Sequence, residues 1–317
     1  MSHVVVVGSF NVDHVWNCST LPRRGETLGG VYHTGPGGKG FNQAVACARA
    51  GARTTFVCAL GDDVGGQQAR DLAAGDAIEL REQRSTHPTG TAGIYVDDAG
   101  HNTIVIGAGA NGDLSAAFVT RQADTLAGAR VLLAQLESPL GSVLEAMRLA
   151  RAAGTTTMLN PAPANAECLR ELLAAADILT PNETEFAALL ERHTSTRVDS
   201  DAIAGSSDAQ LHRLCRTLLP RGTVVITLGA QGAFVSHRED LLRGDDAPSY
   251  RVPADRVDPI DTTGAGDAFN GALAASMAGA TTTAFAVHVR FATRYAGLST
   301  EHTGAATAMP HLQAATP

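Results

Sequence analysis

The chain turns sharply at Asp261-Thr262-Thr263-Gly264-Ala265-Gly266-Asp267 and continues directly into the apolar segment 268–273. Small residues permit a tight turn, and the pattern that follows predicts the start of a buried helix. The free amides and the dipole of a helix N-terminus favour an anion that gains charge during a reaction. Asp267 lies in the same turn and could take a proton from an attacking hydroxyl. The stretch therefore predicts a phosphoryl-transfer centre, and an ordinary capping turn is the alternative on local evidence.

Length and composition restrict the class of protein. The 317 residues suffice for one large α/β domain or two smaller ones. A formal charge of −8 argues against non-specific binding to nucleic acid or to an anionic membrane. The five cysteines form no C-x-x-C pair and the eleven histidines show no H-E-x-x-H spacing, so we expect neither a disulfide framework nor a zinc site. Without a signal-peptide pattern or an apolar run of membrane length, a cytoplasmic protein is expected.

Short β-branched runs alternate with Ala- and Leu-rich helical stretches along most of the chain. This alternation predicts a mainly parallel sheet with helices on both faces, and ligands of such sheets bind beyond the carboxyl ends of the strands. Polar or glycine residues occur at these places: Asn11 and Asp13, Glu137, Asn182 and Gly229. The predicted strands are 4–7, 54–58, 131–136, 155–159, 177–179 and 223–227, and the predicted helices include 43–50, 143–153 and 207–219.

A second, smaller sheet is predicted from alternating segments. Residues 91–96 and 102–106 alternate on either side of the turn 97–100, which is typical of a β-hairpin. Residues 12–16 alternate in the same way. Such a sheet could cover a site as a lid or pair with a second copy of itself.

The run Gly35-Pro36-Gly37-Gly38-Lys39-Gly40-Phe41-Asn42 superficially resembles a phosphate-binding P-loop. It departs from that motif because Gly40 follows the lysine and because no strand is expected before it. A glycine turn that carries Lys39 and Asn42 can still present amides, an ammonium group and a carboxamide to a polyhydroxylated ligand. A simple loop-to-helix entry is the alternative, although it does not explain the lysine.

Residues Gly107–Gly112 match the dinucleotide pattern G-x-G-x-x-G. The match is weak because it follows a hairpin and lacks the acidic residue expected after a second strand. A loop that returns from the lid is the favoured interpretation. The motif is the main support for an alternative function, that of a nicotinamide-dependent oxidoreductase.

Two further strand ends carry candidate ligands. Glu183 and Glu185 follow Asn182 in a first helical turn, where acids either cap the helix or organise magnesium through water, and local evidence favours neither. Residues 227–233 leave a strand through two glycines. They form either a tight hairpin or a close backbone approach to adenine or its phosphates.

Taken together, seven motifs occur in the order and spacing of the ribokinase branch of the PfkB carbohydrate-kinase family, which the chain resembles from end to end. The motifs are GSFNVD at 8–13, GGKGFNQ at 37–43, QLES at 135–138, NPAP at 160–163, TPNETE at 180–185, TLG at 227–229 and DTTGAGD at 261–267.

The resemblance implies one ribokinase-like α/β domain over residues 1–317. It would be a three-layer sandwich with a mainly parallel central sheet and a lid sheet from segments near 12–34 and 90–107. The implied reaction transfers the γ-phosphoryl group of ATP to the O5 hydroxyl of D-ribose, with Mg²⁺ and K⁺ as cofactors. The implied assembly is a homodimer that pairs through the lid sheets.

The resemblance also implies roles for individual residues. Asp267 would be the base, and the amides of Gly264, Ala265 and Gly266 would form the anion hole. Asn11, Asp13, Gly38, Lys39, Asn42 and Glu137 would hold the sugar. Asn182, Thr227, Gly229, Gln231, Gly232 and Gly266 would line the ATP side, and Glu185 would organise magnesium through water. Potassium would lie near Asp261, Thr263, Ser299 and Gly304.

Two positions depart from the family pattern. Phe41 stands where a small residue is common, next to Asn42, and Ala308 stands where a potassium-binding serine is expected. Phe41 leaves open a kinase of the same family for deoxyribose, another sugar or a nucleoside. A non-catalytic sugar-binding protein is a further alternative, which the intact Asp267 and its glycines disfavour.

Overall fold

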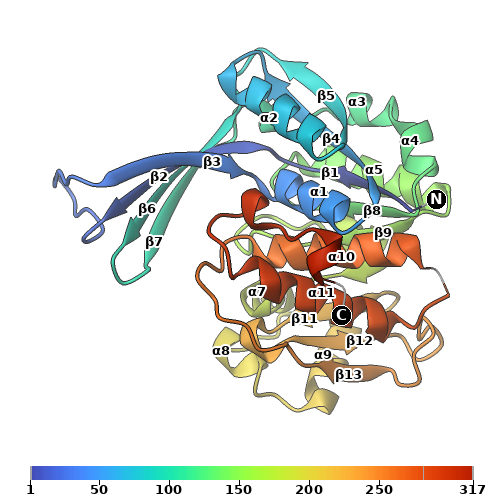
Figure 1. Ribbon diagram of the computed structural model, residues 1–317. Coiled ribbons are helices and arrows are strands. Elements are labelled where there is room, and N and C mark those ends of the chain that lie inside the picture. Colours follow the sequence, from blue (N-terminus) through green and yellow to red (C-terminus); the bar gives the residue numbers. More distant parts are fainter. Residues whose placement is uncertain (1, 281, 316–317) are drawn as a thin grey trace.

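The computed structural model describes residues 2–280 and 282–315 and contains a nine-stranded sheet and a separate four-stranded sheet (Figure 1). The large sheet has the order β13-β12-β11-β10-β9-β8-β1-β4-β5, and all its strands are parallel except β12, which is antiparallel to both neighbours. These strands are β1 (His3–Val7), β4 (Arg53–Gly61), β5 (Glu79–Ser85), β8 (Val131–Ala134), β9 (Thr156–Leu159), β10 (Ile178–Leu179), β11 (Thr223–Thr227), β12 (Ala233–Ser236) and β13 (Ser249–Val252).

Helices cover both faces of the large sheet. In β1, Val4 and Val6 belong to one hydrophobic cluster, whereas Val5 and Val7 belong to another. The first cluster is completed by α1 (Lys39–Arg49), α2 (Val64–Gly75), α10 (Ala265–Gly279) and α11 (Phe285–Ser299). The second is completed by α3 (Ala116–Thr120), α4 (Ala123–Ala127), α5 (Leu140–Ala152), α6 (Arg170–Ala175), α7 (Glu183–Thr194), α8 (Ser200–Ile203) and α9 (Asp208–Leu218). The predicted three-layer α/β class is therefore confirmed.

Small residues bring α1 and α10 into close contact. A Cβ atom on Gly271 of α10 would lie 2.4 Å from the Cβ of Ala46 in α1. The first turn of α1 is held in the same way, because a Cβ on Gly40 would lie 2.4 Å from the backbone nitrogen of Ser9 at the end of β1. These approaches set the start of α1 beside the start of α10, at the carboxyl end of the sheet.

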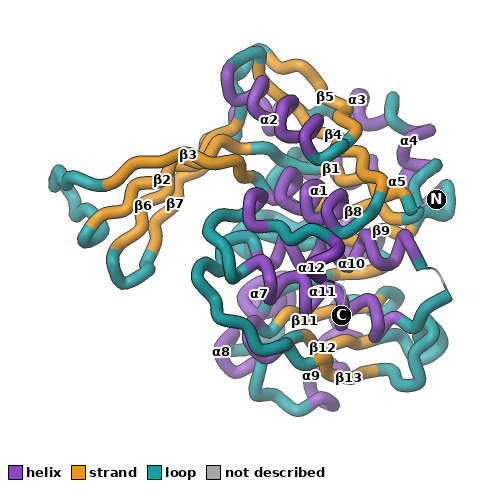
Figure 2. The backbone as a smooth tube through the Cα atoms, viewed as in Figure 1, coloured by secondary structure: helices purple, strands orange, loops and turns teal. Residues whose placement is uncertain are grey.

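The small sheet has the order β3-β2-β6-β7 and extends away from the body (Figure 2). It comprises β2 (Asn11–Cys18), β3 (Val31–Gly37), β6 (Gly90–Asp97) and β7 (Asn102–Gly107). The predicted hairpin is present as β6 and β7. The prediction that no strand precedes the glycine-rich turn before α1 was wrong, because β3 leads into it. Gly35 and Pro36 obscure this strand in the sequence, and its edge position tolerates them.

The remaining described elements are the 3₁₀ turns η1 (Gly109–Asp113), η2 (Gly229–Gln231) and η3 (Ala306–Ala308), and α12 (Leu312–Ala315). All five cysteines are buried and unpaired. Among the described residues, no helix combines the length and apolar character that crossing a bilayer requires.

Candidate active site

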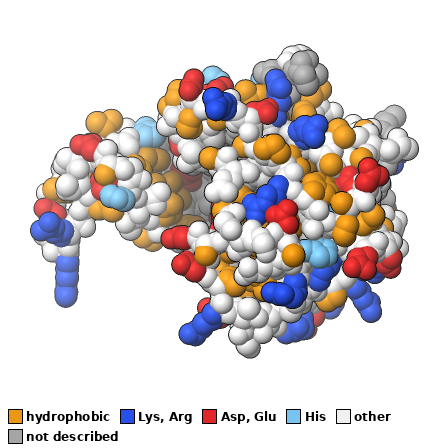
Figure 3. Space-filling view, turned by 90° about the horizontal axis from the view of Figure 1, so that it is seen from below, with side chains coloured by type: hydrophobic (Ala, Val, Ile, Leu, Met, Phe, Trp, Pro, Cys, Tyr) orange, Lys and Arg blue, Asp and Glu red, His pale blue; other side chains and the backbone are white. Residues whose placement is uncertain are grey.

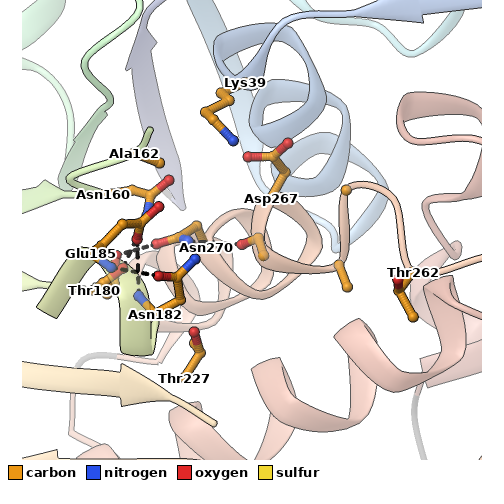
Figure 4. Close-up of a pocket in the computed structure, with 13 residues that line it drawn as sticks. Lys39, Asn160, Ala162, Thr180, Asn182, Glu185, Thr227, Thr262, Asp267 and Asn270 are labelled. Atoms are coloured by element: carbon orange, nitrogen blue, oxygen red, sulfur yellow. Dashed lines mark hydrogen bonds between the residues drawn. The ribbon is translucent and has the colours of Figure 1, made fainter. Parts of the chain in front are cut away.

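A pocket of about 170 Å³ opens at the carboxyl ends of the central strands, beside the start of α10 (Figure 4). Lys39 from α1 and Asp267 from α10 point toward one another at one side, and Asn182, Glu185 and Thr227 approach from the strand side. The complete lining comprises Lys39, Asn160, Ala162, Thr180, Asn182, Glu185, Thr227, Thr262, Gly264, Ala265, Gly266, Asp267 and Asn270.

Asp267 is buried in this wall, with 5% of its surface exposed. Two side-chain amides of α1 hold its carboxylate, since Asn42 donates to Oδ2 at 2.9 Å and Gln43 donates to Oδ1 at 2.8 Å. Burial raises the pKa of Asp267, and although the Lys39 charge and these two donors oppose the rise, the pKa remains above its usual value. A buried carboxylate with a raised pKa and fixed orientation is suited to accept a proton.

The Gln43 amide has an orientation fixed by its neighbours. The Thr180 carbonyl can only accept, so the nitrogen of the Asn160 amide faces it, at 2.9 Å. The oxygen of Asn160 then receives a hydrogen bond from Gln43 Nε2 at 3.0 Å. Gln43 Oε1 in turn accepts from Gln135. This chain of polar groups directs an N–H of Gln43 toward Asp267.

Lys39 faces three acidic residues. Burial alone would lower the pKa of its ammonium group, but the charges of Asp267, Glu137 and Glu185 outweigh burial and raise the pKa. Glu137 is fixed by the Ser9 hydroxyl at 2.6 Å and by the backbone N–H of Lys39 at 3.0 Å. Lys39 therefore stays charged and links the two sides of the site.

The residues predicted to hold the sugar gather on the lid side of Asp267. Asn11 and Asp13 lie two residues apart on one face of β2, and the Asp13 carboxylate packs against Gly37, where an added Cβ would lie 2.2 Å from Oδ2. Gly38 has a φ of 86° and packs on the backbone of Asn11. Asn42 Oδ1 is buried without a hydrogen-bond partner in the described chain. Such an orphan acceptor is suited to receive a ligand hydroxyl.

Asp13 titrates near neutral pH. Burial, together with the charges of Glu137 and Asp267, raises the pKa of Asp13 to about 7. Because this pKa is raised on folding, the stability that the group contributes is complete at low pH and is lost as the pH rises through about 7.

An Asp13→Asn variant is therefore expected to be more stable than the wild type, and the gain should be larger at pH 8 than at pH 5. The difference between the two gains should be roughly 2 kcal/mol, because only the wild type carries the Asp13 carboxyl group that loses its proton over this range. Thermal and urea unfolding at both pH values measure it. Asp98→Asn, in the exposed lid turn, is the matched control, and an equal gain at both pH values would contradict the expectation.

The start of α10 supplies backbone donors to the pocket. Gly264 has a φ of 76°, and in the described chain neither its N–H nor that of Gly266 has a protein acceptor. The N–H of Ala265 is directed differently and donates to the Thr262 carbonyl at 3.2 Å. Of the three backbone N–H groups in the predicted anion hole, those of Gly264 and Gly266 thus remain free to bind an anion.

Glu185 caps its own helix and also faces the pocket. Asn182 caps α7 by accepting from the Glu185 N–H at 2.8 Å, and Glu185 returns the bond by accepting from the Asn182 N–H at 2.9 Å. Both side chains also line the pocket. Among the described residues, no group of three His, Cys, Asp or Glu side chains could hold a metal directly. A lone carboxylate fits Mg²⁺ bound through water.

Of the residues predicted for the ATP side, Thr227 lines the pocket and pairs with Asn182, whereas the following glycines shape the turn into β12. Leu228 donates to the Gly232 carbonyl at 2.8 Å. Gly232 has a φ of 88°, and a Cβ there would lie 2.0 Å from the Val252 carbonyl oxygen. Gly229 and Gln231 form η2 and do not line this pocket.

The residues predicted to surround potassium come from the loop before α10, from the last residue of α11 and from the loop that follows α11. The Asp261 carboxylate accepts from the N–H of Thr263 and from the N–H of Gly304, both at 2.9 Å. Burial would raise the pKa of Asp261, but these bonds lower it. Ser299 precedes Thr300, whose carbonyl accepts the N–H groups of Ile260 and Asp261. The carboxylate and carbonyl oxygens of these residues are ligands of the type that a hard cation prefers.

Several polar residues that our sequence reasoning left without a role belong to the site. Their signal lay inside motifs quoted for other reasons: Gln43 closes GGKGFNQ, Gln135 opens QLES and Asn160 opens NPAP. Phe41 instead lies away from the pocket. It is 1% exposed and packs against Phe10 and Phe56 in the core.

A family model and several known proteins resemble this chain over most of its length. The family model described as "pfkB family carbohydrate kinase" matches residues 1–312. A ribokinase of Haemophilus influenzae is 36% identical over 98% of this chain and 96% of its own. A deoxyribokinase of Salmonella typhi is 33% identical over 86% of this chain and 84% of its own. The structure of Arabidopsis thaliana ribokinase with ribose and ATP has a TM-score of 0.82 and 28% identity, covering 98% of this chain and 96% of that one.

Proposed function

Because the chain belongs to the pfkB family of carbohydrate kinases, we propose that it is an ATP-dependent ribokinase that forms ribose 5-phosphate from D-ribose. One observation carries the proposal. The buried Asp267 lies between two groups of polar residues, with Asn11, Asp13 and Asn42 on the lid side and Asn182 and Thr227 on the strand side. A sugar and a nucleotide can therefore approach the same carboxylate from opposite sides.

In the proposed reaction, Asp267 accepts the proton of the ribose O5 hydroxyl as O5 attacks the γ-phosphorus of ATP. The bond between that phosphorus and the β,γ-bridging oxygen breaks, and ADP leaves with the electron pair. The free amides of Gly264 and Gly266 stabilise charge on the transferred group. Most of the rate enhancement comes from positioning and from charge neutralisation.

Two cations complete the proposal. Glu185, through water, would hold the Mg²⁺ that accompanies ATP and neutralises its phosphates. Asp261, with the backbone near Thr263, Ser299 and Gly304, would hold K⁺ and thereby fix the loop that precedes the anion hole. Gly264 packs against Ala305, the residue after Gly304, since a Cβ on Gly264 would lie 2.8 Å from the Ala305 Cβ, so an ion held beside Gly304 would act on the same turn.

We also propose that residues 1–317 act as a single catalytic domain and pair as a homodimer through the lid. Val15, Ile94 and Ile104 are cross-strand neighbours on the lid face that carries Asp13, and Ile104 is 50% exposed. Hydrophobic side chains are visible on the projecting lid (Figure 3). An exposed apolar sheet of this kind favours a second copy as its cover. Sedimentation velocity measures the assembly.

The cytoplasm is the proposed location, because five buried free thiols suit a reducing compartment. The oxidoreductase alternative loses its support, since Gly107–Gly112 follows a lid strand instead of opening a helix on the main sheet.

A coupled ADP-release assay tests the function, with ribose, deoxyribose, fructose and nucleosides as acceptors, each with and without potassium. Ribose should give the highest kcat/KM, and potassium should increase it. Phe41 gives no reason to expect another acceptor, because its ring is in the core. A higher kcat/KM with deoxyribose or a nucleoside would overturn the substrate assignment and leave the carbohydrate-kinase family intact.

A further inference from the structure

The glycine-rich segment 107–112 has no role in the function described so far, yet it places one polar side chain against Asn11, a residue of the proposed sugar site. Asn111 lies in η1, directly after lid strand β7, and is 3% exposed. Its Oδ1 accepts from the Phe10 N–H at 3.0 Å. Its Nδ2 donates to the Phe10 carbonyl and to Asn11 Oδ1, each at 2.9 Å.

These contacts determine which way the Asn11 amide points. A backbone N–H can only donate and a carbonyl can only accept, so the two contacts with Phe10 fix the oxygen and nitrogen positions of Asn111. The nitrogen of Asn111 must then face an acceptor, which is Asn11 Oδ1. The Nδ2 of Asn11 is consequently turned away, and within residues 2–280 and 282–315 it has no protein acceptor.

A glycine makes room for this pair of amides. Gly90, the first residue of β6, lies beside Asn11 in the lid sheet. A Cβ on Gly90 would lie 2.2 Å from Asn111 Nδ2 and 2.4 Å from Asn11 Oδ1. Even one methyl group would therefore displace both side chains, so the orientation of Asn11 depends on the start of β6 as well as on η1.

We propose that Asn111 is a positioning residue for sugar binding, which fixes the Asn11 amide so that its Nδ2 donates to a sugar hydroxyl. The proposal rests on the proposed function, in which Asn11 contacts the sugar. The direction of this donor is then set by η1 and by Gly90, which lie where the lid joins the body. A purely structural role, in which Asn111 only satisfies the Phe10 backbone, is the competing explanation.

A double-mutant cycle separates these explanations. In Asn111→Asp, an oxygen still accepts from the Phe10 N–H, but the donors to the Phe10 carbonyl and to Asn11 are lost, and the Asn11 amide should turn over. The KM for ribose should rise about tenfold, the effect of one hydrogen bond, while kcat stays within about threefold. In an Asn11→Ala background, the same change should raise the KM less than about twofold.

Gly90→Ala provides a second variant should Asn111→Asp fold poorly. It should also raise the KM for ribose, and this rise should also disappear in the Asn11→Ala background. Gly93→Ala in the same strand is the matched control, because the nearest atom to its Cβ would be the Val105 oxygen at an ordinary 3.9 Å. Equal KM factors in both backgrounds, or a loss of kcat without a change in KM, would overturn the proposal. Absence of ribose turnover by the wild type would instead refute the proposed function. The double-mutant cycle would then be measured with the acceptor that gives the highest kcat/KM in the ADP-release assay.

Discussion

Replacing Asp267 by Asn is expected to lower kcat by about 10²- to 10⁴-fold while the protein remains folded and still binds ribose, because the amide cannot accept the O5 proton. The surroundings can accommodate the change. Gln43 is fixed by Asn160 and continues to donate to the oxygen at position 267. The new NH₂ group then faces Asn42, whose unpartnered Oδ1 can turn to accept it.

Steady-state ADP release gives kcat for this variant, and calorimetry gives its ribose affinity, which should weaken by no more than about tenfold, the effect of a single hydrogen bond. Asp258→Asn is the matched control, since Asp258 is exposed in the segment that leads to the same turn. A variant at position 267 that retains kcat within tenfold of the wild type would remove Asp267 as the base. Loss of ribose binding with unchanged kcat would assign it to sugar recognition instead.

The parts of the site that are contiguous in sequence could be predicted from sequence. The turn 261–267 contains its own glycines, its acid and the apolar residues that continue as α10, so local rules describe it. Asn182 and Glu185 are similar, since a capping box is a pattern of four residues. Their places relative to one another followed from the rule that ligands bind at the carboxyl ends of parallel strands.

The parts that depend on distant contacts could not be predicted. Gln43 meets Asp267 across 224 residues, and the motif that it closes does not show which distant group its side chain contacts. Asn111 meets Phe10 across 101 residues, and its segment resembles a nucleotide motif that it does not form. Phe41 is adjacent in sequence to Asn42, which holds Asp267, but one position on a helix rotates its side chain by about 100° and directs it into the core.

Edge strands were missed for a different reason. Strand β5 reads ELREQRS and contains a single apolar residue, so hydrophobic periodicity gives no signal there. Its pairing with β4 is fixed by backbone hydrogen bonds and by the ion pair between Arg53 of β4 and Glu79 of β5 at 3.1 Å. Strand β13 pairs with β12 in the same way at the opposite edge. Composition predicts buried strands well, whereas strands that face water are determined by their partners.

A Gly264→Ala variant is expected to lose about 10²- to 10³-fold in kcat, the effect of removing one oxyanion-hole donor, with little change in ribose affinity. Gly264 has a φ of 76°, which an alanine adopts only with strain, and the new Cβ would lie 2.8 Å from the Cβ of Ala305. The turn must shift to relieve this contact, and its free amides move with it. ADP-release kinetics measure kcat, and thermal unfolding measures the accompanying loss of roughly 1–3 kcal/mol.

Gly279→Ala separates catalysis from stability in this experiment, because it makes the same substitution at the other end of α10, where a Cβ would meet no atom within 4 Å. It should have wild-type kcat and equal or slightly higher stability, since alanine favours helix. If Gly264→Ala lost stability but kept its kcat, the amides of this turn would not be the groups that stabilise the transferred phosphoryl. The positive charge of Lys39, which lies beside Asp267 at one side of the pocket, would then have to supply that stabilisation.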